Sequence, residues 1–199
     1  MPEDAQALLV FAHGAGAGHT HKNMDGIACA WAEVGLASLR YNFPFIEAGR
    51  RRVDSKPVTL DTIEAAYSYA DAEFDLPVFL AGHSFGGRMN SHAVVERNLD
   101  PAGLIFCAFP LHQPKKPSVA RAEHLTGIVH PMLFLSGTRD DLAEAELLQN
   151  VVEGLTDGRL EWLDTANHSY AVLKRSRTNP LPVFDEIADH TIKFVRSIV

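Results

Sequence analysis

The chain has 199 residues, which is enough for one domain with a substantial core and too few for two ordinary domains. Its content of 46% hydrophobic and 22% charged residues is typical of a soluble globular protein. The formal net charge of −7 argues against a nucleic-acid partner, and no apolar run reaches the roughly 18 residues of a membrane span. We therefore expect a single domain over residues 1–199, with neither nucleic acid nor membrane as a partner.

Short apolar runs alternate with amphipathic segments along the whole chain. Most of these runs are continuously apolar rather than alternating, a pattern typical of parallel strands that are buried on both faces. The expected strands lie at 7–13, 36–42, 77–82, 102–109, 131–137 and 159–164.

Between these runs, apolar residues recur at spacings of three and four, which predicts helices. The first stripe runs from Met24 to Trp31, and Gly35 follows it as a predicted helix-ending residue. The remaining helices are expected at about 60–74, 84–99, 142–155 and 182–198. The alternation predicts an α/β fold of about six mostly parallel strands with helices on both faces. Only 43–59 and 110–130 are long irregular stretches.

The two cysteines, Cys29 and Cys107, are far apart and show no zinc-site spacing. Cys29 falls on a helical apolar stripe and Cys107 falls in an apolar strand, so both are predicted to be reduced core residues. No basic segment followed by an apolar stretch opens the chain, as a secretory signal would require. These features predict a cytoplasmic protein without disulfides.

The third apolar run ends in the stretch Gly82-His83-Ser84-Phe85-Gly86, which another glycine follows. A serine on a tight turn between a strand and a helix projects its hydroxyl above the sheet, and glycines permit the crowding that such a turn imposes. The alternative is that Ser84 only caps the following helix. The apolar run before the motif and the helical pattern after it favour a nucleophile.

Two further strand ends supply the partners that a nucleophilic serine needs. The carboxyl ends of parallel strands meet at one edge of a sheet, so residues that follow them can converge there. His168 follows the sixth run and is the predicted base; Asp140 follows the fifth and is the predicted acid that orients it. Asp141 is expected to cap the next helix, which leaves Asp140 free. The chain order Ser84, Asp140, His168 is that of one hydrolase architecture.

The first apolar run ends in the glycine-rich stretch "HGAGAGH" at 13–19. Glycines let a backbone approach a substrate oxygen, so the amide of Ala15 is predicted to complete an oxyanion hole with the amide of Phe85. A dinucleotide fingerprint would need glycine where His19 stands, and the Gly-Lys-Ser/Thr of a P-loop is absent. No ligand spacing indicates a metal. We expect neither a cofactor nor a metal.

The stretches "FAHGAGAG", "GHSFGGR", "LSGTRDDL" and "ANHSY" together resemble the α/β-hydrolase superfamily over nearly the whole chain. Within it, "LRYNFPF", "GHSFGGRM", "FPLHQPKKP", "RAEHL" and "SGTRD" resemble a small family of predicted hydrolases related to testis-expressed protein 30 and to a subunit of a histone-acetyltransferase complex. Dienelactone hydrolase is a more distant relative, which has a cysteine nucleophile where this chain has Ser84. The resemblance implies a minimal α/β-hydrolase fold. The segment between 110 and 130 is too short for a large lid domain.

Further residues are expected to contact substrate. Phe43 follows the second strand, while His112 and Arg121 lie in the segment expected to overhang the nucleophile. For His112 and Arg121 the alternative role is loop anchoring or surface solvation, and the stretch that contains Phe43 also reads as a turn that ends the strand. Arg88 is expected to form a structural ion pair rather than a substrate contact. The set is completed by residues that flank the predicted oxyanion hole and nucleophile: Gly14, Gly16 and His83.

These features predict a serine hydrolase that acts on a small ester, thioester or amide-like acyl substrate. Two alternatives stay open. One is a non-catalytic binding or scaffolding module that kept the fold, and the other is an acyltransferase with the same triad. The run Arg50–Arg52 is either a solvated loop or a patch for an acidic substrate group.

Overall fold

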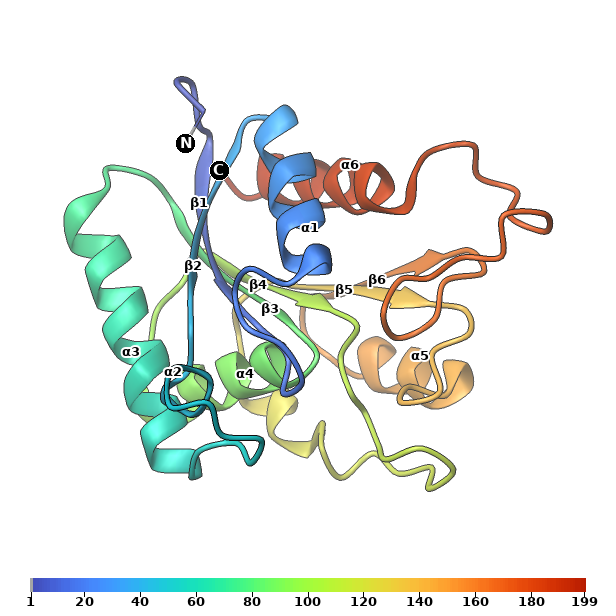
Figure 1. Ribbon diagram of the computed structural model, residues 1–199, viewed down its shortest axis with the longest axis horizontal. Helices are drawn as coiled ribbons and strands as arrows, with labels where there is room; N and C mark the ends of the chain where they lie inside the picture. Colours follow the sequence, from blue (N-terminus) through green and yellow to red (C-terminus); the bar gives the residue numbers. More distant parts are fainter. Residues whose placement is uncertain (1) are drawn as a thin grey trace.

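The computed structural model describes residues 2–199, and its centre is an open sheet of six parallel strands (Figure 1). Their order in the sheet is β2-β1-β3-β4-β5-β6. The expected sheet is confirmed, and every strand lies within two residues of its predicted bounds. The strands are β1 (Ala7–Ala12), β2 (Leu36–Tyr41), β3 (Val78–His83), β4 (Gly103–Cys107), β5 (Met132–Gly137) and β6 (Gly158–Leu163).

Helices cover both faces of this sheet. Helices α1 (Lys22–Glu33) and α6 (Val183–Arg196) pack side by side on one face (Figure 1). On the other face lie α3 (Lys56–Glu73), α4 (Phe85–Arg97) and α5 (Ala145–Glu153). This arrangement is the α/β fold that the alternating pattern predicts, and it agrees with the α/β-hydrolase fold that the resemblance implies.

The sheet separates two hydrophobic cores. Alternate residues of one strand enter opposite cores because side chains of a strand point to opposite faces. In β1, Leu8 and Val10 pack with α3 and α4, whereas Leu9 and Phe11 pack with α1 and α6. Burial on both faces explains why the strands are continuously apolar in sequence.

Several local features differ from the expectations. Helix α5 is shorter than the expected 142–155, and the irregular stretches contain α2 (Pro44–Glu47) and a short 3-10 helix, η1 (Glu123–Gly127). Gly35 ends α1 at a φ of +81°, as predicted. Cys107 is buried in β4, but Cys29 is exposed, so its prediction as a core residue is wrong. Cys29 lies on the outer side of α1, whose buried face runs through Ile27 and Trp31.

The segment between β4 and β5 contains only η1 and an isolated bridge between Gln113 and Lys116. This segment therefore adds no lid domain above the sheet within residues 2–199.

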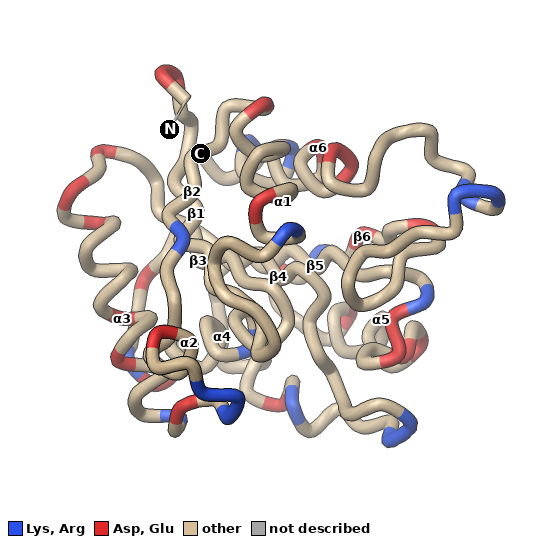
Figure 2. Tube along the Cα trace, viewed as in Figure 1, with Lys and Arg blue, Asp and Glu red and all other residues tan. Residues whose placement is uncertain are grey.

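Among all the helices of residues 2–199, none is both long and apolar enough to cross a bilayer. Figure 2 shows that acidic and basic residues are spread along the helices and loops around the sheet.

Candidate active site

Ser84 lies at the turn between β3 and α4 with a φ of 51° and a ψ of −114°. Such a conformation is strained for a residue other than glycine. The Ser84 side chain makes no capping hydrogen bond to α4. The alternative role as a helix cap is therefore not what the structure shows, and the hydroxyl is available for another partner.

Three glycines make this turn possible. A Cβ atom on Gly82 would lie 2.2 Å from the Gly87 nitrogen, and one on Gly86 would lie 2.5 Å from the Ala12 carbonyl oxygen. A Cβ on Gly87 would lie 2.7 Å from the Gly82 oxygen. These are distances to backbone, which cannot move aside as a flexible side chain can. The glycines let α4 start directly against the ends of β1 and β3.

The predicted triad residues meet at the carboxyl edge of the sheet. The Ser84 Oγ and the His168 Nε2 are 2.8 Å apart, and the His168 Nδ1 lies 2.8 Å and 3.0 Å from the two carboxylate oxygens of Asp140. An ionised carboxylate can only accept, so the Nδ1–H of His168 donates to it. The Nε2 is then free to accept the hydroxyl proton of Ser84.

Asp140 is held in place by the turn that follows β5. Its side chain is fully buried, and one carboxylate oxygen accepts a hydrogen bond of 2.9 Å from the backbone N–H of Leu142. The prediction that Asp141 caps the next helix is wrong. Asp140 itself caps this turn, and α5 begins only at Ala145, without a side-chain cap.

The loop that carries His168 is shaped by Asn167. The side-chain oxygen of Asn167 accepts hydrogen bonds from the backbone N–H groups of Ser169 and Ala171, at 3.0 Å and 2.9 Å. From α1, the Asn23 amide donates to the Ser169 carbonyl at 2.8 Å. Neither asparagine was predicted from the sequence to shape the site. An asparagine next to the predicted base was a usable signal, because Asn often forms such local turns.

The glycine-rich loop is anchored by His13, whose structural role the sequence pattern did not predict. His13 is fully buried, and its Nε2 accepts a hydrogen bond of 3.0 Å from the Phe43 N–H. Its Nδ1–H therefore donates to the Gly14 carbonyl at 2.8 Å. Burial lowers the pKa of His13, which favours this neutral form. His13 thus joins the loop after β1 to the loop after β2.

The two amides predicted to form an oxyanion hole are available. Within residues 2–199, neither the Ala15 N–H nor the Phe85 N–H donates to a protein acceptor. Phe85 is the first residue of α4, where backbone N–H groups have no intrahelical partner. Ala15 lies in the exposed loop beside Ser84, between Gly14 and Gly16.

His83 precedes the nucleophile and lies between the glycine-rich loop and the His168 loop. Its Nε2 is 3.3 Å from the His168 carbonyl oxygen, and a Cβ on Gly14 would lie 3.1 Å from its Nδ1. Burial, reinforced by the neighbouring His168, lowers the pKa of His83 to about 4. His83 is thus neutral near pH 7 and adds no charge beside the triad.

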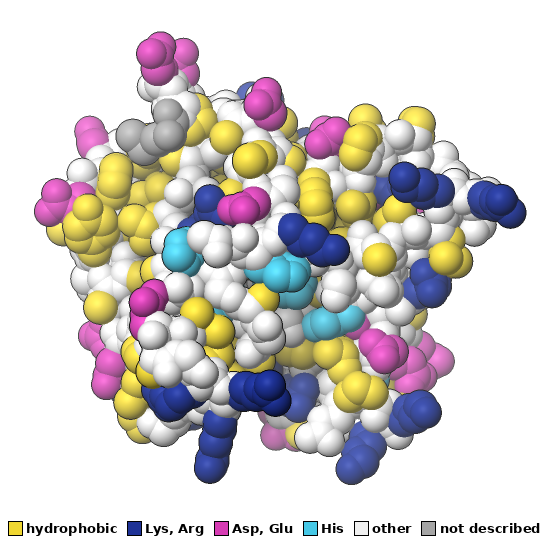
Figure 3. All heavy atoms as spheres, viewed as in Figure 1, with side chains coloured by type: hydrophobic (Ala, Val, Ile, Leu, Met, Phe, Trp, Pro, Cys, Tyr) yellow, Lys and Arg dark blue, Asp and Glu magenta, His cyan; other side chains and the backbone are white. Residues whose placement is uncertain are grey.

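A pocket of about 320 Å³ opens above Ser84. It brings together four residues predicted to contact substrate or oxyanion (Gly14, Ala15, Gly16 and His83) and two members of the triad. Figure 3 shows histidine side chains gathered near the centre of one face of the molecule. The full lining is Gly14, Ala15, Gly16, Ala17, His21, Asn23, Met24, His83, Ser84, His168 and Ser169.

The other predicted substrate contacts do not reach this pocket. Phe43 is fully buried in the core, where its ring packs against Phe85 with centroids 5.6 Å apart. His112 is buried, and its Nε2 accepts from the Glu144 N–H at 2.9 Å. Arg121 donates to the carbonyl of His112 at 3.1 Å. The last two anchor loops, which is the alternative role that the sequence left open.

Arg88 also differs from its prediction. Its guanidinium group forms neither an ion pair nor a hydrogen bond within the part of the chain that the structure describes. In the same part, no group of three or more His, Cys, Asp or Glu side chains is placed to hold a metal ion.

The comparisons with known proteins agree with this architecture. The family model described as "Alpha/beta hydrolase domain" matches residues 5–196. The chain therefore belongs to the α/β-hydrolase domain family.

Solved structures of similar fold cover nearly the whole chain. Est1E from Butyrivibrio proteoclasticus, in a structure with bound ferulic acid, is 15% identical with a TM-score of 0.74, covering 100% of this chain and 92% of its own. Dienelactone hydrolase from Anabaena variabilis is 17% identical with a TM-score of 0.74, covering 100% and 89%. A serine hydrolase without lid from Xanthomonas campestris is 18% identical with a TM-score of 0.73, covering 98% and 84%. At these identities the likeness shows a common fold.

Proposed function

We propose that this protein is a serine hydrolase that cleaves a small ester, thioester or amide-like acyl substrate. The observation that carries the proposal is the continuous hydrogen-bonded chain from Ser84 through His168 to the buried Asp140. A serine hydroxyl is a weak nucleophile until a base removes its proton, and this chain provides the base and the group that orients it.

In the first half of the proposed reaction, the Ser84 Oγ attacks the substrate carbonyl carbon while its proton moves to the His168 Nε2. Asp140 stabilises the imidazolium that forms and holds the ring in the required tautomer. The negative charge that develops on the carbonyl oxygen is accepted by the amides of Phe85 and Ala15. Collapse of this intermediate breaks the bond to the leaving group, which takes the proton from His168 and leaves an acyl-serine.

In the second half, water attacks the acyl-serine and gives one proton to His168. The second tetrahedral intermediate collapses to a carboxylic acid, and the proton on His168 returns to the Ser84 oxygen. Both halves use residues of this chain alone, so the proposal needs no cofactor. An acyltransferase would differ only in using an alcohol or amine instead of water.

The size of the site favours small substrates. The pocket above Ser84 has about 320 Å³, and within the described residues 2–199 no lid domain covers it. Structures of similar fold are described as an esterase domain, a dienelactone hydrolase and a monoacylglycerol lipase. These descriptions support acyl-ester chemistry but differ in substrate. The narrower resemblance to the family of testis-expressed protein 30 stays a prediction.

A fluorophosphonate probe, which labels activated serines, tests the proposal. The wild-type protein should be labelled, whereas Ser84→Ala and His168→Ala should not. Ser68→Ala is a suitable control because Ser68 is an exposed serine on α3 that lines neither the pocket above Ser84 nor its neighbour beside Phe85. Equal labelling of the Ser84→Ala protein would contradict the proposal.

A panel of p-nitrophenyl esters of increasing acyl length, with a few thioesters and amides, then defines the substrate class. Turnover that disappears in Ser84→Ala is the expected result. No turnover over the whole panel, together with a stoichiometric protein partner in a pull-down, would instead favour the scaffolding alternative.

A further inference from the structure

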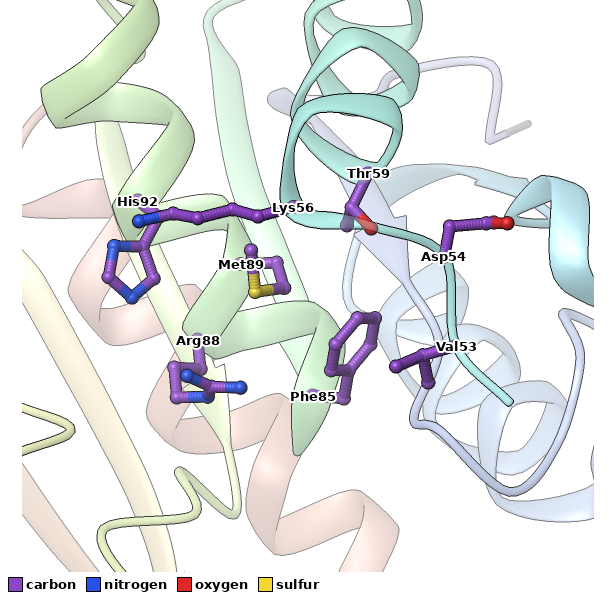
Figure 4. Close-up of a pocket in the computed structure, with 8 residues that line it drawn as sticks. All are labelled: Val53, Asp54, Lys56, Thr59, Phe85, Arg88, Met89 and His92. Carbon is purple, nitrogen blue, oxygen red and sulfur yellow. The ribbon is translucent and has the colours of Figure 1, made fainter. Parts of the chain in front are cut away.

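A second pocket, of about 240 Å³, lies beside Phe85 between α4 and the chain that enters α3 (Figure 4). Helix α4 contributes residues at positions 85, 88, 89 and 92, which share one helix face. The proposed mechanism uses only the backbone amide of Phe85 from this set. The lining residues are Val53, Asp54, Lys56, Thr59, Phe85, Arg88, Met89 and His92.

Arg88 brings an uncompensated positive charge into this pocket. Its Nε is buried without a hydrogen-bond partner, and within residues 2–199 no carboxylate pairs with its guanidinium. Burial and the neighbouring positive charge of Arg121 lower the pKa of Arg88. Arg88 as a whole is half-buried and only its Nε is buried without a partner, so the donors of this guanidinium are left open to an added acceptor.

The other charged groups of the pocket already have partners. Lys56 pairs with Glu96 at 2.5 Å. The Asp54 carboxylate accepts from the Phe45 N–H at 2.8 Å and from Arg50 at 2.6 Å, and Figure 4 shows it directed away from the other lining side chains. These pairs cancel, and they leave Arg88 to set the charge of the pocket.

Two histidines and a second arginine also face Arg88. Burial lowers the pKa of His92, and it lowers the pKa of His124, on the segment after β4, to about 4. Both imidazoles are therefore neutral near pH 7. Arg121 donates to the carbonyl oxygens of Pro110 and His112 and does not line the pocket.

Arg88 lies one helical turn after the nucleophile. Its N–H donates to the Ser84 carbonyl at 3.1 Å, and four residues of helix advance about 6 Å along the axis. Figure 4 shows the guanidinium group on the side of Met89 that is nearer Phe85. The apolar side chains of Val53, Phe85 and Met89 line the same pocket as Arg88, and Phe85 directly follows Ser84 in the chain. A short methylene chain suits this apolar lining, and a negative group suits its charged end.

We propose that this second pocket receives the acyl part of the substrate and that Arg88 binds a carboxylate at the end of that part. The inference rests on the proposed function and specifies its substrate class: monoesters or monothioesters of short dicarboxylic acids. A single uncompensated charge matches a carboxylate better than a dianionic phosphate, and the planar guanidinium can hold both carboxylate oxygens. Hydrolysis with one water then yields a free dicarboxylic acid and an alcohol or thiol.

The test compares two esters with the same number of acyl carbons, monoethyl glutarate and ethyl pentanoate, by following ethanol release. Wild-type protein should have a kcat/KM about 10- to 100-fold higher for the anionic ester, the size expected for a charged hydrogen bond. Arg88→Met should abolish this preference mainly through KM for the anionic ester, and Arg88→Lys should restore part of it. A preference that survives in Arg88→Met, or its absence in the wild type, would overturn the inference.

Arg97→Met is the matched control, because it removes the same charge from the same helix. Arg97 pairs with Asp61 and Glu64 on α3 and does not line the pocket. The preference should persist in this variant if it depends on Arg88 rather than on net charge. Equal loss in both variants would contradict a specific site. Thermal melting of each variant verifies that it is folded.

A binding experiment separates this inference from the proposed function. Free glutarate should bind the Ser84→Ala protein in a calorimetric titration, and it should not bind the Ser84→Ala/Arg88→Met protein. Arg88-dependent binding without any ester turnover would overturn the hydrolase proposal and support the anion site. Ser84-dependent turnover with no preference and no glutarate binding would overturn the anion site alone.

Discussion

Ser84 holds a backbone conformation that only its surroundings can enforce. Its φ of 51° and ψ of −114° place the hydroxyl 2.8 Å from the His168 Nε2. Strain of this kind costs about 1–3 kcal/mol per residue and persists where the packing around it leaves no alternative. The strained β3–α4 turn thus lowers the stability of the fold and, in return, positions the Ser84 Oγ beside His168.

Substituting this residue separates the cost of the backbone conformation from the loss of the hydroxyl. Both Ser84→Ala and Ser84→Gly should lower turnover by about 10³-fold or more, because the proposed triad acts as a unit. Glycine tolerates a positive φ and alanine does not, so Ser84→Gly should be more stable than Ser84→Ala by about 1 kcal/mol. Urea unfolding measures the difference. Equal stability of the two variants would show that the turn is unstrained.

At the scale of elements, the nucleophile depends on how closely α4 approaches the sheet. Gly86 lies against the end of β1, where a Cβ atom would be 2.5 Å from the Ala12 carbonyl oxygen. The helix can start at this point only because no side chain intervenes. The position of Ser84 is therefore a property of three elements, β1, β3 and α4.

Gly86→Ala tests this dependence. We expect a loss of about 3 kcal/mol or more in the free energy of unfolding, since the added methyl group meets backbone rather than a mobile side chain. Fluorophosphonate labelling should fall with it, because the helix start must shift. Gly127→Ala is the matched control, since nothing lies within 4 Å of its added Cβ and its φ is not in the left-handed region. A change of similar size in both variants would contradict the packing argument.

The elements and the triad could be predicted because they follow from patterns within short stretches of sequence. Strands buried on both faces must be continuously apolar, and the ends of parallel strands must meet at one edge. The surroundings of the triad depend instead on contacts between distant segments. Phe43 looks like a pocket wall in sequence, yet its N–H donates to His13, 30 residues earlier, and its ring enters the core. No local pattern records such a hydrogen bond.

Arg88 is the reverse case: the sequence predicted a structural ion pair, and the structure leaves its side chain without a partner within residues 2–199. An arginine in a helix is most simply expected to pair with a carboxylate, but which carboxylates face it depends on how α3 and the segment after β4 pack against α4. Here the nearby acids, Asp54 and Glu96, are paired with Arg50 and Lys56. An unpaired arginine is a property of the assembled fold.

At the scale of the whole molecule, four buried or half-buried histidines lie around the two pockets, one in the glycine-rich loop and the others in β3, α4 and η1. Burial lowers the pKa of His13 and His92, and it lowers the pKa of His83 and of His124 to about 4. These imidazoles are neutral in the folded protein near pH 7, and they hold together the glycine-rich loop, the nucleophile turn and the segment after β4. Their protonation links the stability of the fold to pH.

The sign of this linkage follows from the direction of the shifts. Between pH 6.5 and about 4 the unfolded chain binds protons on these histidines that the folded protein does not bind, so stability must fall as the pH falls. A single histidine with a pKa near 4 accounts for up to about 3 kcal/mol across that range. We expect the urea midpoint to be highest above pH 7 and to decrease steadily from pH 6.5 to pH 4.5.

His124→Gln distinguishes this mechanism from a general effect of acid. The glutamine cannot be protonated, so the variant should lose less stability than the wild type between pH 6.5 and 4.5, even though the lost contact with the Ser91 hydroxyl, at 2.8 Å, weakens it at pH 7.5. Measurements above pH 4.5 avoid the range in which most carboxylates titrate. Identical pH profiles for the two proteins, or a wild-type midpoint that does not change over this range, would contradict the linkage.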